Sequence, residues 1–526
     1  MLGFAPSLAF GTLPLNDPVN IELLPSGKTL RLPRGTPLQD ALFEHGVEFP
    51  CGGRGRCKAC RIKTKGGTLT ITAEDRQRLT PAELSDGWRL ACRARAEADL
   101  TLELAQWEAA ILSDETVFPF TPQEGWGIAV DLGTTTIVAQ LIDLKTGGVL
   151  GVRTALNLQA KHGADVMSRV EFAVASQGHQ ALRDLVREQI GTLSKGLVSE
   201  VQRTATGTAT VPSLTLRDIV VVGNTVMHHL FCDRDLEPLS HVPFEPQHPG
   251  LHTFPASDLG WDWANTATVR FLPCLGGFVG SDILAGIIAT NLHQSDSLAA
   301  LIDLGTNGEI VVGNRDGLLC ASTAAGPAFE GARISMGMRA ATGAISEVHL
   351  QGGELHCHVL GQGAARGICG SGLVDAVAVG LETGGIQPRG RLANGSSLPL
   401  TGSVSLSQTD IRELQLAKGA IAAGLRILLE QWGASEDDLG RVYLAGAFGN
   451  YINYSSARRI GLLKFLPEKV SPAGNTALLG AKIALFGLRE HRGAYPDILG
   501  KVAHVSLHED PRFQDVFVEE MSFPAE

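Results

Sequence analysis

Two segments of this 526-residue chain repeat each other, and this duplication constrains the fold more than any other feature. Residues 127–144 read GIAVDLGTTTIVAQLIDL, and residues 300–314 read ALIDLGTNGEIVVGN. Each segment is an apolar strand that ends in Asp-Leu-Gly-Thr, followed by a turn and a second strand. In the last 400 or so residues, glycine-rich turns alternate with apolar strands and helical stretches. The pattern predicts an α/β fold with a duplicated core.

The turn in each copy, Asp131–Thr136 and Asp303–Glu309, has the chemistry of a phosphate-binding loop. Glycine exposes backbone N–H groups to phosphate oxygens, threonine hydroxyls add donors, and an aspartate at a strand end can hold Mg²⁺ or its waters. One such hairpin is a weak signal, whereas two facing copies are a strong one. We expect Asp131, Asp303 and Glu309 to be catalytic. The alternative is that the aspartates only terminate strands and that Glu309 faces solvent.

A third segment, RVYLAGAFGNYIN at residues 441–453, is an apolar strand that enters a turn of small residues. Such a turn lets a flat base or a ribose approach the backbone closely. Two more glycine-rich turns, GGFVGSDI with Asp282 and GICGSG with Gly370–Gly372, are either further walls of the same site or simple tight turns.

These three segments together resemble the actin-like ATPase superfamily, which includes sugar kinases, the heat-shock chaperone ATPase and actin. The resemblance implies a ribonuclease H-like fold with ATP and Mg²⁺ bound between two lobes. The residues implied to contact the nucleotide are Gly133, Thr134, Thr135, Thr136, Gly305, Thr306, Asn307, Gly308, Gly446, Ala447, Gly449 and Asn450.

Four cysteines near the N-terminus, Cys51, Cys57, Cys60 and Cys92, have the spacing C-x5-C-x2-C-x31-C. Three thiolates from one loop and a fourth from a distant strand suit a [2Fe–2S] cluster. Zinc sites usually take their ligands from two short pairs, so zinc and unligated thiols are the weaker alternatives. The loop resembles the adrenodoxin-like variant of the ferredoxin loop. We therefore expect the chain to carry an electron.

The elements around these cysteines predict a β-grasp ferredoxin-like domain at residues 17–104. Residues 18–34 suggest two strands joined at Pro25-Ser26-Gly27, and Thr36-Pro37 is expected to start a helix. The remaining boundaries are a linker at 105–124, a first actin-like or middle subdomain at 125–215 and a C-terminal ATP-binding domain at 216–526.

Charge and composition exclude several classes of partner. The net charge of −11 and the absence of a basic block argue against nucleic acid. No apolar run approaches the roughly 20 residues that span a bilayer, and no signal peptide is evident, so we expect a cytoplasmic protein. Nine cysteines, an odd number, fit a reducing compartment. The five outside the cluster motif are expected to be buried small residues: Cys232, Cys274, Cys320, Cys357 and Cys369. The role of Cys369 stays open, because its glycine-rich loop could approach a ligand.

The adjacent histidines His228 and His229, close to Cys232, also raise the question of a metal site. They lie in VVGNTVMHHLF, which predicts a strand, a glycine turn and the start of a helix. Neighbouring helical residues point to different faces and rarely chelate one ion, so we expect these histidines to be ordinary packing residues.

The linear order of ferredoxin domain, linker and actin-like ATPase resembles the reductive activators of corrinoid-dependent methyltransferases over nearly the whole chain. Further segments that carry the resemblance are NLQAKHGADVMSRVEFA (157–173), VVGNTVMHHLF (221–231), FLPCLGGFVGSDI (271–283), AAGPAFEGARISMGMRA (324–340) and GICGSGLVDA (367–376). The resemblance implies an ATP-hydrolysing protein whose cluster passes one electron to a Co(II) corrinoid protein and returns it to Co(I). It also implies a corrinoid methyltransferase partner, a separate electron donor and a homodimer.

Other classes remain as alternatives. A small-molecule kinase with a fused iron–sulfur redox sensor would use the same actin-like core. A plain electron carrier with a degenerate ATPase domain is disfavoured by the intact Asp131, Thr134, Asp303 and Gly446. A flavin or nicotinamide oxidoreductase is disfavoured because no G-x-G-x-x-G fingerprint opens a helix.

Overall fold

The computed structural model describes residues 18–24, 27–43, 45, 47, 55, 60–104, 118–163, 165–175, 178–205, 215–340, 343–360, 364–449, 451–487 and 495–525. These residues form two compact units, 18–104 and 118–525. Cys51, Cys57 and Asn450 of the predicted sites, and residues 105–117 of the predicted linker, lie outside the described residues.

The first unit is the predicted β-grasp sheet, with strand order β2-β1-β7-β4-β5. Its strands are β1 (Pro18–Leu24), β2 (Lys28–Pro33), β4 (Arg61–Gly66), β5 (Trp88–Leu90) and β7 (Leu100–Leu104). In β1, Val19, Ile21 and Leu23 are buried and the residues between them are exposed, as expected for a strand with one face on a core. β1 pairs antiparallel with β2, which confirms the hairpin, and parallel with β7.

The helices of this unit are short. α2 (Ala73–Arg78) and α3 (Pro81–Ser85) each begin with a threonine capping box. α1 (Leu38–Phe43) begins after the predicted position, because Thr36 and Pro37 form a strand, β3, that pairs with β6 (Arg95–Ala96). The start of α1 therefore depends on a strand partner 60 residues away, which a local helix signal does not include.

The second unit contains two six-stranded sheets, and each includes one copy of the repeat. The first sheet has the order β10-β9-β8-β11-β13-β12. Its strands are β8 (Trp126–Leu132), β9 (Thr136–Asp143), β10 (Val149–Leu156), β11 (Leu216–Gly223), β12 (His252–Pro255) and β13 (Thr268–Phe271). β8 and β9 form an antiparallel hairpin, and β11 lies parallel to β8. The predicted domain boundary after residue 215 therefore falls inside this sheet, between segments that pair with each other.

The second sheet has the order β23-β22-β14-β15-β16-β24 and repeats this arrangement. Its strands are β14 (Ala299–Leu304), β15 (Gly308–Asn314), β16 (Gly317–Thr323), β22 (Arg441–Ala445), β23 (Val470–Gly474) and β24 (Val502–His504). β14 and β15 form the second hairpin, and β22 lies parallel to β14 as β11 does to β8. The predicted duplicated α/β core is confirmed.

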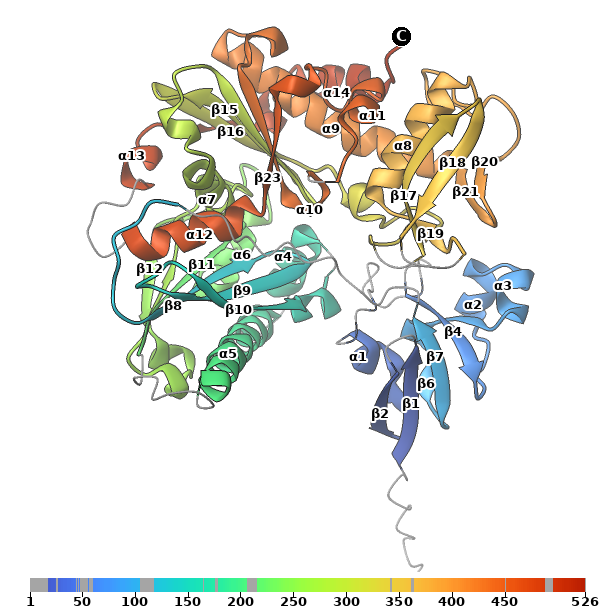
Figure 1. Ribbon diagram of the computed structural model, residues 1–526, viewed down its shortest axis with the longest axis horizontal. Helices are drawn as coiled ribbons and strands as arrows, with labels where there is room; N and C mark the ends of the chain where they lie inside the picture. Colours follow the sequence, from blue (N-terminus) through green and yellow to red (C-terminus); the bar gives the residue numbers. More distant parts are fainter. Residues whose placement is uncertain are drawn as a thin grey trace, which may run out of the picture. The chain divides into compact units, whose positions relative to one another are not determined.

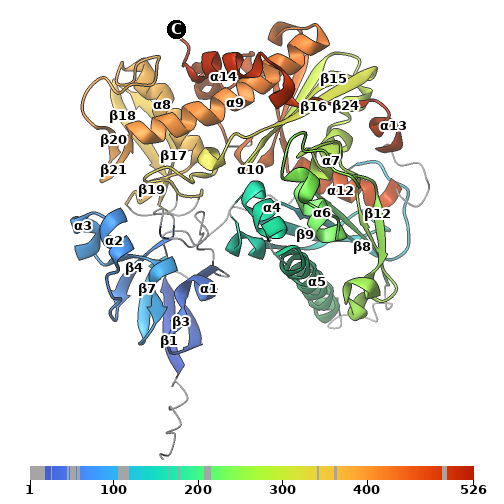
Figure 2. The same ribbon diagram turned by 180° about the vertical axis from the view of Figure 1, so that it is seen from behind.

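Two helices, α7 (Ser281–Thr290) and α12 (Thr476–Gly487), pack against each other and join the two sheets (Figure 1). Their apolar residues share one buried cluster with residues of both hairpins, such as Ala129 and Leu301. Figure 2 shows the same helices from behind, with α4 (Val166–Ala175) and the long α5 (Gly178–Ala205) beside the first sheet. Among the described residues, no helix combines the length and apolar character needed to cross a bilayer.

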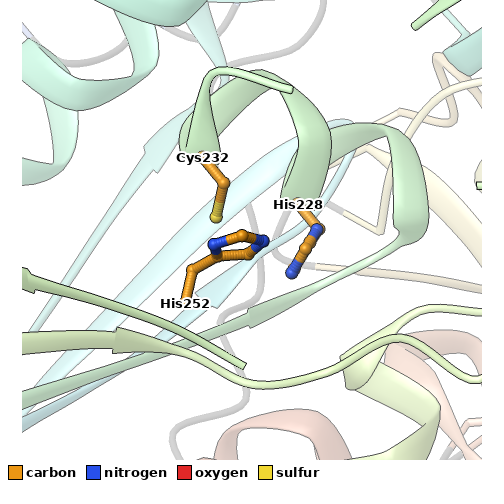
Figure 3. A group of neighbouring side chains, drawn as sticks. All are labelled: His228, Cys232 and His252. Carbon is orange, nitrogen blue, oxygen red and sulfur yellow. The ribbon is translucent and has the colours of Figure 1, made fainter. Parts of the chain in front are cut away.

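α6 (Thr225–Cys232) follows β11 as the sequence predicts, and Asn224 caps its N-terminus by accepting a hydrogen bond from the Met227 N–H at 3.0 Å. Every residue of this helix is buried. His228 and Cys232 lie one turn apart beside His252 at the start of β12 (Figure 3).

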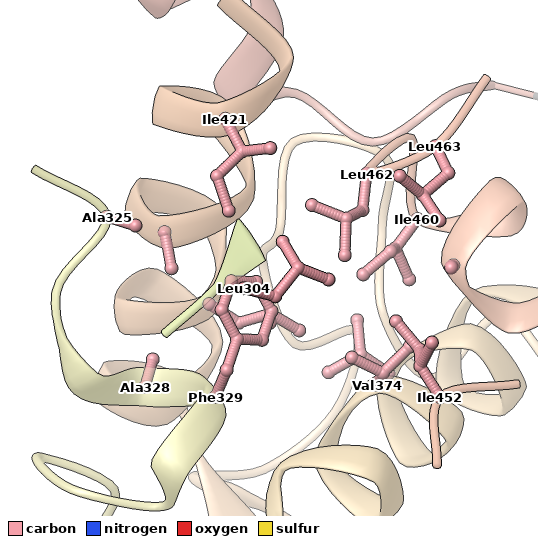
Figure 4. Packing of buried hydrophobic residues seen from close by; sticks show 14 of the residues in the cluster. Leu304, Ala325, Ala328, Phe329, Val374, Ile421, Ile452, Ile460, Leu462 and Leu463 are labelled. Carbon is pink, nitrogen blue, oxygen red and sulfur yellow. The ribbon is translucent and has the colours of Figure 1, made fainter. Parts of the chain in front are cut away.

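The remaining elements of the second unit surround a large apolar core beside the second sheet, and Figure 4 shows the part of this core around Leu304 and Phe329. α9 (Gln408–Trp432) packs on β15 and β16; a Ser407–Asp410 capping box begins it and Gly433, in the left-handed conformation, ends it. The other elements are β17 (Ala344–Gln351), β18 (Glu354–Val359), β19 (Gly367–Ile368), β20 (Ser397–Thr401), β21 (Val404–Ser407), α8 (Gly370–Glu382), α10 (Gly446–Gly449), α11 (Tyr454–Arg459), α13 (Tyr495–Leu499) and α14 (Phe513–Met521).

Residues 118–124, predicted to belong to the linker, are packed on the second unit. The rings of Phe118 and Phe120 lie 5.4 and 4.6 Å from the ring of Phe486 in α12. The side-chain amide of Gln123 donates to the carbonyl oxygen of Phe486 at 3.0 Å. Aromatic burial therefore anchors the end of this segment, which shortens any linker.

Candidate functional site

A cavity of about 350 Å³ in the second unit is lined by both turns of the repeat. This volume lies in the range of small-molecule sites. The lining residues predicted from the sequence are Asp131, Gly133, Thr134, Thr135, Thr136, Asp282, Asp303, Gly305, Thr306, Asn307, Glu309, Gly370 and Gly446. The cavity is also lined by Asn224, Phe329, Glu330, Arg339, Cys369, Ser371, Phe448, Tyr451 and Asn475.

The two turns face each other across this cavity. The hydroxyl oxygens of Thr135 and Thr306 lie 3.5 Å apart, although the residues are separated by 171 positions. Each turn is closed by its glycine N–H: Gly133 donates to Thr136 O at 3.0 Å and Gly305 to Asn307 O at 3.1 Å. The two turns therefore face each other as the sequence predicts, and their binding of phosphate stays a prediction.

Side chains behind the first turn hold its backbone in place. The Asn157 amide donates to Gly133 O at 2.9 Å, and the Asn224 amide donates to the Thr134 hydroxyl at 2.8 Å. Arg169, fully buried, donates to Thr134 O at 2.5 Å and to Gly163 O at 2.9 Å. Burial lowers the pKa of this arginine to about 9. A buried cation next to the turn favours a negatively charged ligand there.

Four carboxylates converge on the cavity: Asp131, Asp282, Asp303 and Glu309. Burial raises the pKa of Asp131 to about 6, against a hydrogen bond from Asn475. Burial and the neighbouring charges raise the pKa of Asp303 to about 7 and of Asp282 to about 8.

Glu309 belongs to the same group. It lies opposite Asp303 in the hairpin and is only 8% exposed, so it does not face solvent. Burial, then Asp282 and Asp303, raise its pKa well above the usual value. Four acidic groups that repel one another in a buried site can share a divalent cation, which supplies the missing positive charge.

Asn475 is one of the contact residues that sequence reasoning missed. Its amide donates to an Asp131 carboxylate oxygen at 2.9 Å across 344 positions. A signal was available, because Gly474-Asn475-Thr476 repeats Gly223-Asn224-Thr225. Both asparagines follow a strand, accept a hydrogen bond from the N–H three residues on and donate to the first phosphate turn or its strand.

Glu330 and an aromatic pair complete the wall. The Thr306 hydroxyl donates to the Glu330 carboxylate at 2.6 Å, which orients the second turn. The rings of Phe329 and Phe448 are stacked, with centroids 4.7 Å apart, and Phe448 lies in the strand–turn segment predicted to approach a base. Stacked aromatic rings offer the apolar surface that a flat base needs.

Two residues of the predicted set lie away from the cavity, and two others are not fully described. Gly308 faces the core, where an added Cβ would lie 2.6 Å from Ile421, and Gly449 packs on the backbone of Leu444. Neither lines the cavity. Ala447 lies within α10, but its side chain is outside the described residues, as is the whole of Asn450.

The first unit brings two of the predicted cluster cysteines together. Cys60 directly precedes β4, and Cys92 lies in the short helix Ala91–Arg93 that follows β5. β4 and β5 are paired, and the N–H of Ala91 donates to the carbonyl oxygen of Cys60 at 3.0 Å. The buried Asp75 accepts a hydrogen bond from Leu90 N at 2.8 Å and so holds the end of β5. The two cysteines therefore lie at neighbouring strand ends, as a shared cluster requires.

Comparison with protein families matches the chain in three consecutive parts. Residues 21–97 match a model for a 2Fe–2S iron–sulfur cluster binding domain. Residues 126–295 match the RACo middle region, and residues 297–526 match the C-terminal domain of RACo, the ASKHA domain. The ferredoxin-like and actin-like assignments agree with the folds of the two units.

Two similar proteins match most of the chain. A protein named corrinoid activation enzyme RamQ, from Eubacterium limosum, is 35% identical over 444 residues, 78% of this chain and 73% of its own. A reductase of the Co(II) methylated amine-specific corrinoid protein, from Methanosarcina barkeri, is 28% identical over 68% of this chain and 69% of its own.

Among solved structures, the reductive activator for a corrinoid, iron–sulfur protein aligns with a TM-score of 0.67 and 28% identity, over 96% of this chain and 98% of the other. The resemblance stated from the sequence is thus confirmed. With its ferredoxin, middle and ASKHA regions in this order, the chain belongs to the RACo family of corrinoid reductive activators.

Proposed function

We propose that this chain passes one electron from a [2Fe–2S] cluster to a Co(II) corrinoid protein, returning it to Co(I), and that Mg-ATP drives the transfer. The observation that carries the proposal is the combination, in one chain, of paired cluster-cysteine positions in the first unit and a buried four-carboxylate cavity between two phosphate turns in the second. The named activities of the relatives support the corrinoid substrate.

The residues of the cavity fit Mg-ATP. The N–H groups and hydroxyls of Gly133–Thr136 and Gly305–Asn307 would bind phosphate oxygens. Asp131, Asp282 and Asp303 would hold Mg²⁺ directly or through its waters, and Glu309 completes the proposed catalytic set. Bound Mg²⁺ neutralises phosphate charge and polarises the bond that is cleaved.

In the first unit, Cys51, Cys57, Cys60 and Cys92 would hold the cluster, which supplies a one-electron carrier. Reduction of a corrinoid to Co(I) requires a stronger reductant than an ordinary ferredoxin. A gap of a few hundred millivolts for one electron corresponds to roughly 5–10 kcal/mol, which ATP hydrolysis can supply.

Coupling requires that nucleotide binding and partner affinity depend on the same conformational equilibrium. The proposed site suits such coupling, because a nucleotide bound there would contact both hairpins and so bridge the two sheets. The further parts of the proposal are a separate protein electron donor, a homodimer formed through the actin-like region and a cytoplasmic location.

An anaerobic assay tests the proposal. The reduced protein, freed of dithionite, is mixed with the Co(II) corrinoid subunit of a methyltransferase, and the Co(I) absorption band is followed with and without Mg-ATP. We expect a rise that depends on Mg-ATP. If a panel of such subunits gives no rise while ATP is consumed on a small metabolite, the kinase alternative replaces this proposal.

Replacement of Gly446 by alanine should block the proposed nucleotide site. Gly446 has φ +81°, and an added Cβ would lie 2.7 Å from an Asp303 carboxylate oxygen and 3.0 Å from Leu304 O. We expect ATP affinity to fall about tenfold or more, equivalent to about 1.4 kcal/mol, measured by titration calorimetry.

Gly433→Ala is the matched control for this variant. Gly433 has nearly the same φ, +80°, but nothing lies within 4 Å of its Cβ position. Both variants carry about 1 kcal/mol of backbone strain, whereas Gly433→Ala should leave ATP affinity unchanged. Equal affinities for the two variants would contradict the placement of Gly446 in the site.

Arg169→Met should weaken both the fold and nucleotide binding. The substitution leaves Thr134 O and Gly163 O buried without their donor and removes the cation behind the first turn. We expect the free energy of unfolding to fall by about 2–4 kcal/mol, from urea titrations, and the KM for ATP to rise. Arg183→Met, which removes exposed ion pairs on α5, should change stability by less than about 1 kcal/mol and leave KM unchanged. An unchanged KM for Arg169→Met would mean that the arginine is purely structural.

A further inference from the structure

A second group of potential ligands lies beside the first six-stranded sheet, and none of its residues lines the cavity. His228, Cys232 and His252 each offer a nitrogen or sulfur atom, and these atoms lie within 4.8 Å of one another. His228 and Cys232 come from successive turns of α6, and His252 comes from β12; in Figure 3 the three side chains converge on one point. His228 was expected to be a packing residue, because His252 lies 24 positions away and has no signal in the sequence that places it beside His228 and Cys232.

The surroundings of His228 are those of a metal-binding imidazole. Its Nε2 lies 3.1 Å from the carbonyl oxygen of Gly250. If the Nε2–H donates to this oxygen, Nδ1 carries no proton and has a free lone pair. Ligand histidines commonly donate their other N–H to a backbone carbonyl in this way, which fixes the tautomer and the ring orientation. The Nδ1 of His228 lies 3.4 Å from the Nδ1 of His229, whose N–H can donate to Thr225 O at 2.9 Å, so a metal ion would be the stronger partner for this buried lone pair.

His252 has a similar arrangement. Its Nε2 lies 3.4 Å from His248 O, and an N–H that points there leaves the ring's lone pair on Nδ1. The Arg234 guanidinium lies 3.3 Å from this Nδ1, and a metal ion bound at Nδ1 would displace it. Arg234 also adds positive charge, which a thiolate formed at Cys232 would offset.

A neighbouring imidazole adds an independent observation. The His229 ring centroid lies 5.3 Å from that of His228, and its Nδ1 lies 2.9 Å from Thr225 O. Its Nε2 is buried and has no hydrogen-bond partner among the described residues. A buried polar atom without a hydrogen-bond partner is destabilising and uncommon in native proteins, so hydrogen bonds alone do not satisfy this cluster of imidazoles.

We propose that His228, Cys232 and His252 bind one Zn²⁺ ion. Two imidazole nitrogens and one thiolate form a donor set that zinc prefers, and a water or a nearby imidazole would supply the fourth position. Binding converts the Cys232 thiol to a zinc thiolate and releases its proton to solvent, with no change of oxidation state. Zinc–nitrogen and zinc–sulfur distances of about 2.0 and 2.3 Å require the three atoms to approach by roughly 1 Å.

Zinc at this position would join α6 to β12 behind the first phosphate turn. Asn224, the N-cap of α6, holds the Thr134 hydroxyl in the cavity wall. The ion would thus stiffen the helix that positions this turn.

The test uses the full chain with its cluster loaded to two iron atoms, so that zinc cannot occupy the cluster cysteines. After equilibrium dialysis against Zn²⁺, metal analysis should find one zinc per chain. Cys232→Ser and His252→Asn should each lower this value at least tenfold while iron stays at two. Cys320→Ser, a buried cysteine in the second sheet, should keep the zinc.

Cobalt gives a second measurement, and its result for the wild-type chain does not depend on the stability of any variant. Co²⁺ bound to the wild-type chain should show the ligand-field bands of a tetrahedral site and a thiolate charge-transfer band, which the His252→Asn variant should lose. Less than about 0.1 zinc per wild-type chain, or zinc unchanged in both variants, would overturn the proposal.

Discussion

Replacing Asp303 with alanine is expected to abolish ATP-dependent reduction of a Co(II) corrinoid protein while leaving the visible spectrum of the iron–sulfur cluster intact. The Asp303 carboxylate lies at the end of β14 in the buried acidic group, where we propose that it binds Mg²⁺. Loss of a preorganised electrostatic group at such a site typically costs about 100- to 1,000-fold in rate. The rate of Co(I) formation with saturating Mg-ATP measures this loss.

The variant should fold normally. Burial and the charge of Asp131 raise the pKa of Asp303 to about 7. Without a cation, keeping this carboxylate ionised in the folded protein therefore costs free energy. Its removal should leave the unfolding temperature of the nucleotide-free protein unchanged or higher, whereas stabilisation by added Mg-ATP should disappear.

Asp316→Ala is a suitable control, because Asp316 is exposed in the turn between β15 and β16 of the same sheet. It should keep full activity. Retention of activity by Asp303→Ala would contradict the proposed role of this residue. Loss of the cluster spectrum would instead mean that the two units depend on each other.

Replacing Cys92 with serine is expected to remove the cluster and all electron transfer, while Mg-ATP binding persists. Cys92 and Cys60 lie at paired strand ends, and a [2Fe–2S] cluster needs four thiolates. Iron analysis, the visible spectrum and ATP titration of the purified variant provide the measurements. Cys60→Ser should behave in the same way.

Cys357→Ser provides the matched control, since Cys357 lies in β18 of the other unit and is partly exposed, so the expectation that it is buried was wrong. It should retain two iron atoms and full activity. A Cys92→Ser variant that keeps a stable two-iron cluster would rule out this residue as a required ligand, and the spacing argument would then fail at its fourth position.

Sequence patterns predicted the elements whose signals are local. The apolar strands and Asp-Leu-Gly-Thr turns gave both hairpins, because strand periodicity and turn chemistry depend on residues only a few positions apart. The spacing of the cysteines likewise predicted that Cys92 returns to the neighbourhood of Cys60. Repetition of a strong local pattern was sufficient to predict that two halves face each other.

Contacts between distant segments needed the tertiary structure. Glu330 orients Thr306, and Arg169 holds the first turn from inside the lobe, but neither contact has a sequence signature. The start of α1 was displaced because Thr36 and Pro37 found a strand partner in β6. Burial and distant pairing override local preference in such cases.

The sequence by itself thus determined the parts of this protein: a four-cysteine ferredoxin unit, a duplicated actin-like core and the catalytic carboxylate candidates. The tertiary structure decided which residues from distant segments lie side by side. It placed Asp282 and Asn475 beside Asp131, and it brought His252 to the helix of His228. Turn chemistry depends on nearest neighbours, whereas the charge of a buried site depends on every group that folding brings within a few ångströms.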